Sequence, residues 1–154
     1  LGAKIHGYNG DNAATFAAGK VSDEAKRLCD TTKESLYKGI EAAVAGGRLG
    51  DVGHAVQSYC EDRGYGVVRE YTGHGVGTKL HEDPSVPNFG TPGRGVRLLP
   101  GMVIAIEPMI NEGTAAIKQM PDGWTVKTKD GKLSAHFEHT VAITANGPLI
   151  LTQA

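Results

Sequence analysis

The sequence has little of what would place it in several large classes of protein. Its two cysteines are too few for a disulfide framework and are not in CxxC spacing. It has no apolar run near the ~20 residues of a membrane-spanning helix, and its opening residues do not predict a signal peptide. The net charge of −1 gives no attraction to nucleic acid or anionic lipid. We therefore expect a cytoplasmic protein with two buried, reduced thiols and neither nucleic acid nor membrane as partner.

One residue type is abundant. The chain has 22 glycines among 154 residues, about twice the usual share of ~7%. They cluster around histidines and turns and form no repeat, which indicates tight turns and close backbone approach at a site. The length fits one domain, residues 1–154.

Hydrophobic periodicity predicts two helices. Ser22 is expected to cap the first, with Asp23 in its first turn, and the apolar pattern runs through Val44 to an end at residues 46–47. Asp51 is expected to cap the second helix, which Gly64 closes.

The remaining elements read as strands. Expected strands cover residues 13–18, 67–71, 102–107, 124–128, 134–144 and 149–152, with a polar connection at 82–95. The Asp-Gly pair predicts a hairpin turn at residues 129–132, and residues 1–10 look like the middle of a hairpin. Two helices followed by an antiparallel sheet make an α+β domain.

Five polar residues stand at strand ends or beside glycines: Asp11, His74, His81, Glu107 and Glu138. A carboxylate within an apolar strand is costly to bury unless it is paired or binds a metal. Taken singly, a strand-end glutamate is more often solvated or salt-bridged, and a histidine among glycines more often belongs to a turn. The combination is what favours a metal site.

The histidines give little support to two other interpretations. The segment GHGVG lacks the lysine of a phosphate-binding loop and does not match GxGxxG before a helix. His6, His54 and His139 have no evident partner in the sequence, so no functional role is assigned to them.

Three stretches carry a family resemblance: TGHGVGTKLHEDPSVPNFG, LLPGMVIAIEPMI and DGWTVKTKDGKLSAHFEHTVAIT. They resemble type I methionine aminopeptidases over nearly the whole chain. The glycine-histidine loop with His-Glu-x-Pro is shared by all peptidases of the pita-bread fold, whereas Asp-Gly-Trp-Thr is specific to the methionine enzymes. The resemblance implies the C-terminal half of that fold plus the last strand of the other half.

The resemblance also implies an activity and a metal site. The family removes the initiator methionine from nascent proteins when the next residue is small, using two divalent metals. By this likeness Asp11 and Glu138 are bridging ligands, and His74 and Glu107 are terminal ligands of one metal. Three carboxylates and one imidazole suit manganese, iron or cobalt better than a structural zinc, although zinc is an alternative.

Further roles follow from the same likeness. Glu107 could accept a proton from the attacking water, and His81 matches a histidine that hydrogen-bonds the substrate and tetrahedral intermediate. Trp124 matches an aromatic wall of the methionine pocket, and Leu80 stands where the family often has an aromatic. The implied partners are N-termini of nascent chains and, as a further candidate, the ribosome.

The sequence departs from the family pattern at its start. The alignment puts the first metal-binding aspartate immediately ahead of Leu1, so we expect a domain incomplete at its N-terminus, completed by a missing segment or companion chain. The second metal site should be impaired and this chain alone nearly inactive. Two alternatives stay open: a related proline-directed metallopeptidase, and a non-catalytic module that binds peptides or proteins.

Overall fold

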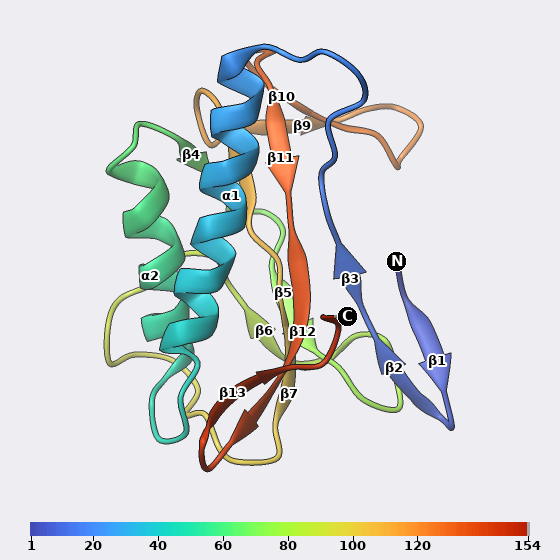
Figure 1. Cartoon of the computed structure of the whole chain (residues 1–154), viewed down its shortest axis with the longest axis vertical. Coiled ribbons are helices and arrows are strands. Elements are labelled where there is room, and N and C mark those ends of the chain that lie inside the picture. Colours follow the sequence, from blue (N-terminus) through green and yellow to red (C-terminus); the bar gives the residue numbers. More distant parts are fainter. Residues whose placement is uncertain (154) are drawn as a thin grey trace.

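The computed structural model describes residues 1–153, which form two helices and a set of antiparallel strands (Figure 1). The helices are α1 (Asp23–Ala42) and α2 (Leu49–Glu61). The first strands are β1 (Ala3–Ile5), β2 (Tyr8–Gly10), β3 (Asn12–Ala13), β4 (Gly66–Val67), β5 (Gly73–Gly75) and β6 (Glu82–Val86). The later strands are β7 (Val103–Ile106), β8 (Met109–Asn111), β9 (Ile117–Gln119), β10 (Val126–Thr128), β11 (Ser134–His136), β12 (Glu138–Thr144) and β13 (Gly147–Ile150). The predicted α+β class is confirmed.

The largest sheet has the strand order β13-β12-β7-β5-β6. On the edge of β12 away from β7, β3 pairs with its first two residues and β13 with its last four. A second sheet has the order β11-β8-β4, and β9 pairs with β10. Strands β5, β7 and β12 are therefore neighbours in one sheet, and β3 joins them from the N-terminal end of the chain.

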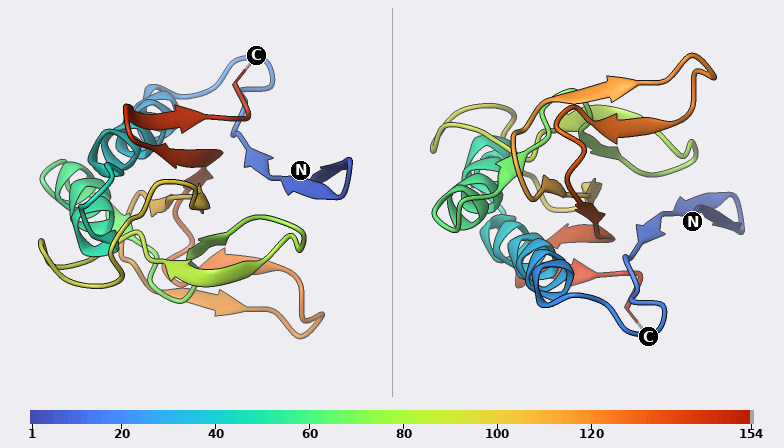
Figure 2. Two further views of the ribbon diagram at one scale, coloured as in Figure 1. Left: turned by 90° about the horizontal axis from the view of Figure 1, so that it is seen from below. Right: turned by 90° about the horizontal axis from the view of Figure 1, so that it is seen from above.

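The two helices lie side by side on one face of the strands (Figure 2). The Ser22 hydroxyl accepts the Ala25 amide (3.2 Å), which confirms the predicted cap of α1. The main core lies between the helices and the large sheet, and includes Leu36, Ile40, Val52, Val86, Leu98, Ile104, Ile106, Val141 and Ile143. Neither helix within the described residues has the length and apolar character needed to cross a membrane.

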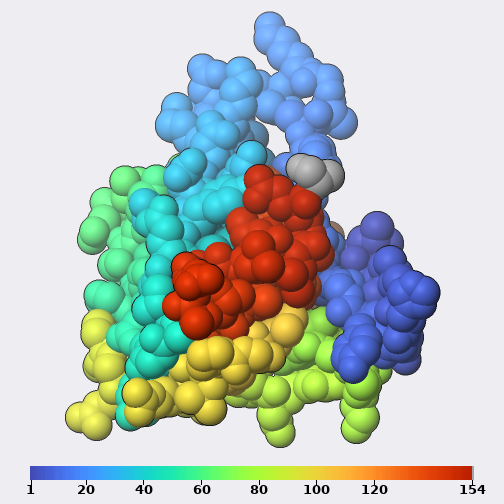
Figure 3. Space-filling view, turned by 60° about the horizontal axis from the view of Figure 1, so that its bottom comes forward, coloured from blue at the N-terminus to red at the C-terminus, as the bar shows by residue number. Residues whose placement is uncertain are grey.

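Residues 1–21 are here called the N-terminal arm, and its hairpin of β1 and β2 projects away from the helices (Figure 2). Strands β1 and β2 form the expected hairpin, turning at His6 and Gly7 with φ of 50° and 88°. The hairpin sits against the loop after β5 (Figure 3). There the main-chain amide of Asn9 donates to the Gly77 carbonyl (2.8 Å). Ile5 is 68% exposed, so this contact buries little of the hairpin.

Two helix-end predictions are corrected. Helix α1 ends at Ala42, before the predicted limit, and Val44 is exposed. Helix α2 begins at Leu49 with Arg48 as its N-cap residue, not at Asp51. Asp51 lies in the first turn, where its carboxylate accepts the Arg48 amide (2.8 Å) and the Gly93 amide (2.6 Å). Asp51 is thus the third residue of the helix, whose carboxylate accepts the amide of the N-cap residue, and not the N-cap itself.

The strand predicted at residues 13–18 is mostly wrong, because β3 ends at Ala13. Beyond it the Thr15 hydroxyl donates to the His136 carbonyl (2.8 Å) and accepts the His136 amide (3.0 Å), so a side chain replaces the ladder. The single strand predicted at 134–144 is divided at Phe137, since β11 pairs with β8 and β12 with β7.

Other strand predictions missed the sheet context. Residues 73–75 and 82–86 form strands inside segments predicted as loop. Gly73 and Gly75 pass so close to neighbouring main chain that a Cβ on either would meet the carbonyl of Ala105 or Asp83. The strands predicted at 67–71, 102–107, 124–128 and 149–152 are shorter or shifted. The turn at 129–132 joins no hairpin, because β10 and β11 pair with different strands.

Candidate metal centre

Four predicted site residues come from four separate segments and meet where β3, β12, β7 and β5 lie next to one another in the large sheet. Asp11 precedes β3, His74 is the middle residue of β5, Glu107 follows β7, and Glu138 begins β12. Ligand atoms of His74, Glu107 and Glu138 all lie within 4.8 Å of one another, and the same holds for Asp11, His74 and His81. The two groups share His74.

The imidazole of His74 is oriented by its own strand. Its Nδ1 lies 2.9 Å from the Gly75 carbonyl, so Nδ1–H donates there and Nε2 is left with a free lone pair. Nε2 is 3.4 Å from Glu107 Oε1 and 4.0 Å from Asp11 Oδ2. This is the arrangement in which a backbone carbonyl fixes the tautomer of a metal-binding histidine.

The two glutamates are set by the ends of their strands. Asn88 donates to the Glu107 carbonyl (3.1 Å), which fixes the main chain where β7 ends. Glu138 is 4% exposed. Burial, and then the nearby carboxylates of Glu107 and Asp11, raise the pKa of Glu138 to about 8. Without a cation, the cluster therefore holds a proton on Glu138 near neutral pH.

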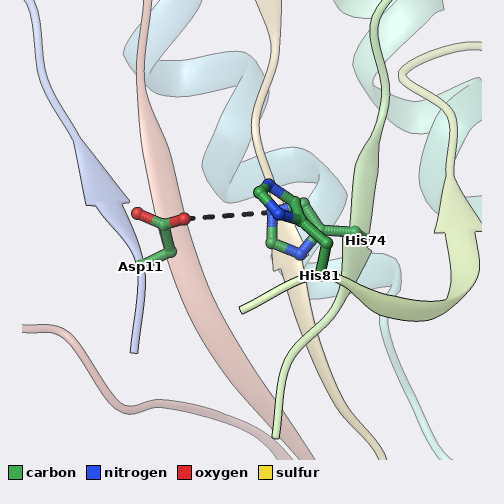
Figure 4. Close-up of side chains that lie close together, drawn as sticks. All are labelled: Asp11, His74 and His81. Atoms are coloured by element: carbon green, nitrogen blue, oxygen red, sulfur yellow. Dashed lines mark ion pairs between the residues drawn. The ribbon is translucent and has the colours of Figure 1, made fainter. Parts of the chain in front are cut away.

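His81 stands beside His74 and Asp11 (Figure 4). Its ring centroid is 4.2 Å from that of His74, and its side chain is exposed. A cavity of about 650 Å³ opens here, with both histidines, Lys79 and Glu82 in its wall. The geometry allows His81 either to reach a cation or to face a bound substrate.

The two predicted pocket residues are less closely associated with the cluster. Leu80 and Asp11 both lie beside Gly2: a Cβ added to this glycine would be 3.1 Å from Leu80 Cδ1 and 3.9 Å from Asp11 Oδ1. Leu80 is therefore near the cluster. Trp124 is 90% exposed in the turn between β9 and β10, and does not line the cavity next to His81. The structure therefore groups Leu80, but not Trp124, with the predicted ligands.

One residue at the site was missed in the sequence. His136 Nε2 lies 3.4 Å from Glu107 Oε2, on the side of that carboxylate away from His74, and has no hydrogen-bond partner among the described residues. It precedes Glu138 by two positions, the spacing that places side chains on one side of an extended chain. That period could have found it. His139, in contrast, bonds Asn12 and Thr152.

The donor set fits a divalent cation. One neutral imidazole nitrogen and three carboxylates are oxygen-rich, of the kind that manganese, iron and cobalt accept. The raised pKa of Glu138 also favours a cation site. A cation would offset both the cost of burying the charged carboxylate and its repulsion by the two neighbouring carboxylates. Deprotonated Glu138, Glu107 and Asp11 with His74 Nε2 would hold it.

Comparisons with known proteins agree with this chemistry. A family model described as metallopeptidase family M24 matches residues 1–145. A methionine aminopeptidase of Clostridium acetobutylicum is 58% identical over 151 residues, covering 98% of this chain and 60% of that protein. The crystal structure of a methionine aminopeptidase from Thermotoga maritima superposes with a TM-score of 0.96 at 50% identity, covering 99% of this chain and 61% of that one.

More distant similarity extends to proline-specific enzymes. A prolidase from Pyrococcus furiosus has a TM-score of 0.75 at 28% identity, covering all of this chain and 40% of that one. The chain spans about three fifths of the length of the curated relatives it matches.

Proposed function

This chain belongs to metallopeptidase family M24, and on that ground we propose that the protein carrying it is a metal-dependent aminopeptidase that removes the initiator methionine from nascent proteins. Its substrates are N-termini whose second residue is small. The observation that carries the proposal is the convergence of Asp11, His74, Glu107 and Glu138 from four separate segments. The greater likeness to methionine aminopeptidases than to the prolidase supports this specificity.

The proposed roles follow from position. A bound pair of divalent metals would lower the pKa of a water and polarise the scissile carbonyl. Glu107 is proposed to accept the proton of that water. His81, exposed towards the cavity, is proposed to donate a hydrogen bond where negative charge develops on the substrate oxygen. Leu80 and Trp124 are proposed to contact the methionine side chain of the substrate. Trp124 is exposed here, so its proposed contact requires further polypeptide that covers this part of the surface.

Partners and location are proposed on the same basis. Nascent N-termini are the substrates, and the ribosome, where they emerge, is the proposed partner. The free thiols of Cys29 and Cys60 fit the reducing cytoplasm. Residues 1–154 are proposed to be part of one catalytic domain.

The test uses two proteins. The first is the 154-residue chain. The second, here called the completed fusion, has an added N-terminal segment ahead of Leu1. That segment is the part of the Clostridium acetobutylicum relative that precedes the region matched by this chain. We expect the chain to retain at most one metal after dialysis and to show negligible hydrolysis of Met-Ala-Ser. The completed fusion should bind two metals and release methionine.

Three outcomes separate the alternatives. Hydrolysis of an Ala-Pro dipeptide in preference to Met-Ala-Ser by the completed fusion would favour a proline-directed enzyme. Metal-dependent peptide binding without hydrolysis would favour a binding module. A completed fusion carrying Glu138→Gln is the matched control, and it should lose metal and activity together.

A further inference from the structure

The main chain of Asp11 is held by one side chain. The Asp11 amide donates to Thr140 Oγ1 (2.8 Å), and the same hydroxyl donates to the Asp11 carbonyl (2.8 Å). Thr140 is 1% exposed, so neither bond is shared with bulk water. Asp11 precedes β3 and makes none of the ladder pairs of that strand.

The strand register explains why a side chain is needed there. Strands β3 and β12 pair Ala13 with Glu138 and Asn12 with His139, so the next pair would set Asp11 opposite Thr140. The main chain of Thr140 is already engaged by the C-terminal segment, its amide with Thr152 Oγ1 (3.1 Å) and its carbonyl with the Leu151 amide (2.8 Å). A hydroxyl can both donate and accept, and it replaces the missing ladder bonds.

We propose that Thr140 is a positioning residue for the metal-binding cluster, fixing the Asp11 carboxylate relative to Glu138. Glu138 lies two residues before Thr140 on β12, so the two side chains leave the strand on the same side. One strand thus supplies one carboxylate and determines the place of another. The inference rests on the proposed metal-binding function and extends it to a residue that does not itself bind the metal.

A nearly isosteric change isolates the hydroxyl. Thr140→Val keeps the shape of the side chain but removes the donor and acceptor that hold Asp11. Loss of such outer hydrogen bonds typically weakens metal binding by about 10- to 100-fold. Thr140→Ser keeps the hydroxyl and should stay within about twofold of the original affinity.

The chain offers a matched control in another buried threonine. Thr32 on α1 is fully buried, and its hydroxyl donates to the Leu28 carbonyl (2.7 Å) within the same helix. Thr32→Val therefore loses a buried hydroxyl while leaving the cluster untouched. It should lower the melting temperature without changing metal affinity.

The experiment is a Co²⁺ titration of the 154-residue chain and the three variants, followed by calorimetry and by the visible absorption of bound Co²⁺. We expect weaker binding and an altered Co²⁺ spectrum for Thr140→Val alone. Should that variant not fold, Thr140→Ala takes its place, because it also removes the hydroxyl and introduces no metal-binding group.

Several results would overturn the inference. They are unchanged affinity in Thr140→Val, equal weakening in Thr140→Ser, or equal weakening in Thr32→Val. If neither the unmodified chain nor the completed fusion binds Co²⁺, the proposed function fails and this inference fails with it. If only the completed fusion binds, the same variants are titrated in the fusion. If it binds and Thr140→Val binds equally, only the inference fails.

Discussion

The helix-covered sheet and the N-terminal arm hold their parts of the site by different means. Ile106, next to Glu107, is fully buried under the helices, whereas Ile5 in the arm is mostly exposed. His74, Glu107 and Glu138 come from the packed sheet, and Asp11 alone comes from the arm. Packing therefore places three ligands, while hydrogen bonds from Thr140 place the fourth. The cluster lies where a rigid region meets a lightly held one.

The largest expected effect tests the packing difference directly. Ile106→Ala should lower the free energy of unfolding by about 2–5 kcal/mol, because it leaves a cavity in a close-packed core. The same change at Ile5, which is exposed, should cost within about 0.5 kcal/mol. Urea unfolding followed by circular dichroism measures both. Equal costs would mean that the arm is packed as firmly as the sheet.

The next prediction separates ligands from the residue facing the substrate. In the completed fusion, His81→Ala should lower kcat for Met-Ala-Ser by about 100- to 1000-fold, the usual cost of removing a donor to a developing oxyanion. Its metal content should not change. Peptide kinetics and metal analysis on one preparation decide the matter. Loss of metal would make His81 a ligand, which its distance from Asp11 and His74 allows.

A smaller contrast compares a sheet ligand with the arm ligand. His74→Ala should weaken Co²⁺ binding by more than ~100-fold, beyond the effect of typical outer-shell changes, because both groups of potential ligands include this imidazole. Asp11→Ala should weaken binding at least as much as Thr140→Val, by about 10- to 100-fold, and less than His74→Ala, since the sheet ligands remain in place. Calorimetric titration of the 154-residue chain gives both values. An equal loss would show that the arm ligand is as firmly placed as the sheet ligand.

The smallest expected effect is a pH dependence that originates in the sheet. The folded pKa of Glu138 is raised to about 8 from 4.5, so between these values the metal-free folded chain holds a proton that the unfolded chain releases. Its stability should therefore fall as pH rises through this window. We expect a loss of about 1 kcal/mol between pH 5.5 and 7.5, because side-chain relaxation and water reduce the full effect.

Thermal unfolding in a chelator at the two pH values measures this change. Glu138→Gln cannot ionise and should flatten the dependence, while a same-charge change far from the cluster, Glu41→Gln on the exposed face of α1, should leave it intact. Metal binding needs ionised Glu138, so Co²⁺ affinity should rise with pH over the same range. A slope unchanged by Glu138→Gln would assign the pH dependence to another group.

The sequence predicted the features that depend on local signals and missed those that depend on contacts distant in sequence. Helices α1 and α2 were found because their apolar period and the Ser22 cap are local signals. Strand β5 was missed because Gly73 and Gly75 have no strand propensity, and they are required by neighbours distant in sequence. Strand ends and neighbouring glycines singled out Asp11, His74, Glu107 and Glu138 as metal-site candidates, and the family resemblance assigned their roles as ligands. The spacing of two residues from Glu138 was a local signal for His136, but its contact with Glu107 depends on which strands pair, and single-segment patterns do not contain that information.

The pair of threonine hydroxyls at the two ends of β3 has a consequence for how the arm finds its place. Thr140 bonds both main-chain groups of Asp11, and Thr15 bonds both main-chain groups of His136, one on each side of a two-residue ladder. Two ladder pairs alone would tolerate a slip. A shift of the arm by one residue would remove all four hydroxyl bonds at once and turn the side chain of Asp11 to the opposite face of the sheet. The register of the arm against β12 is thus set by two side chains acting together, one at each end of the short ladder.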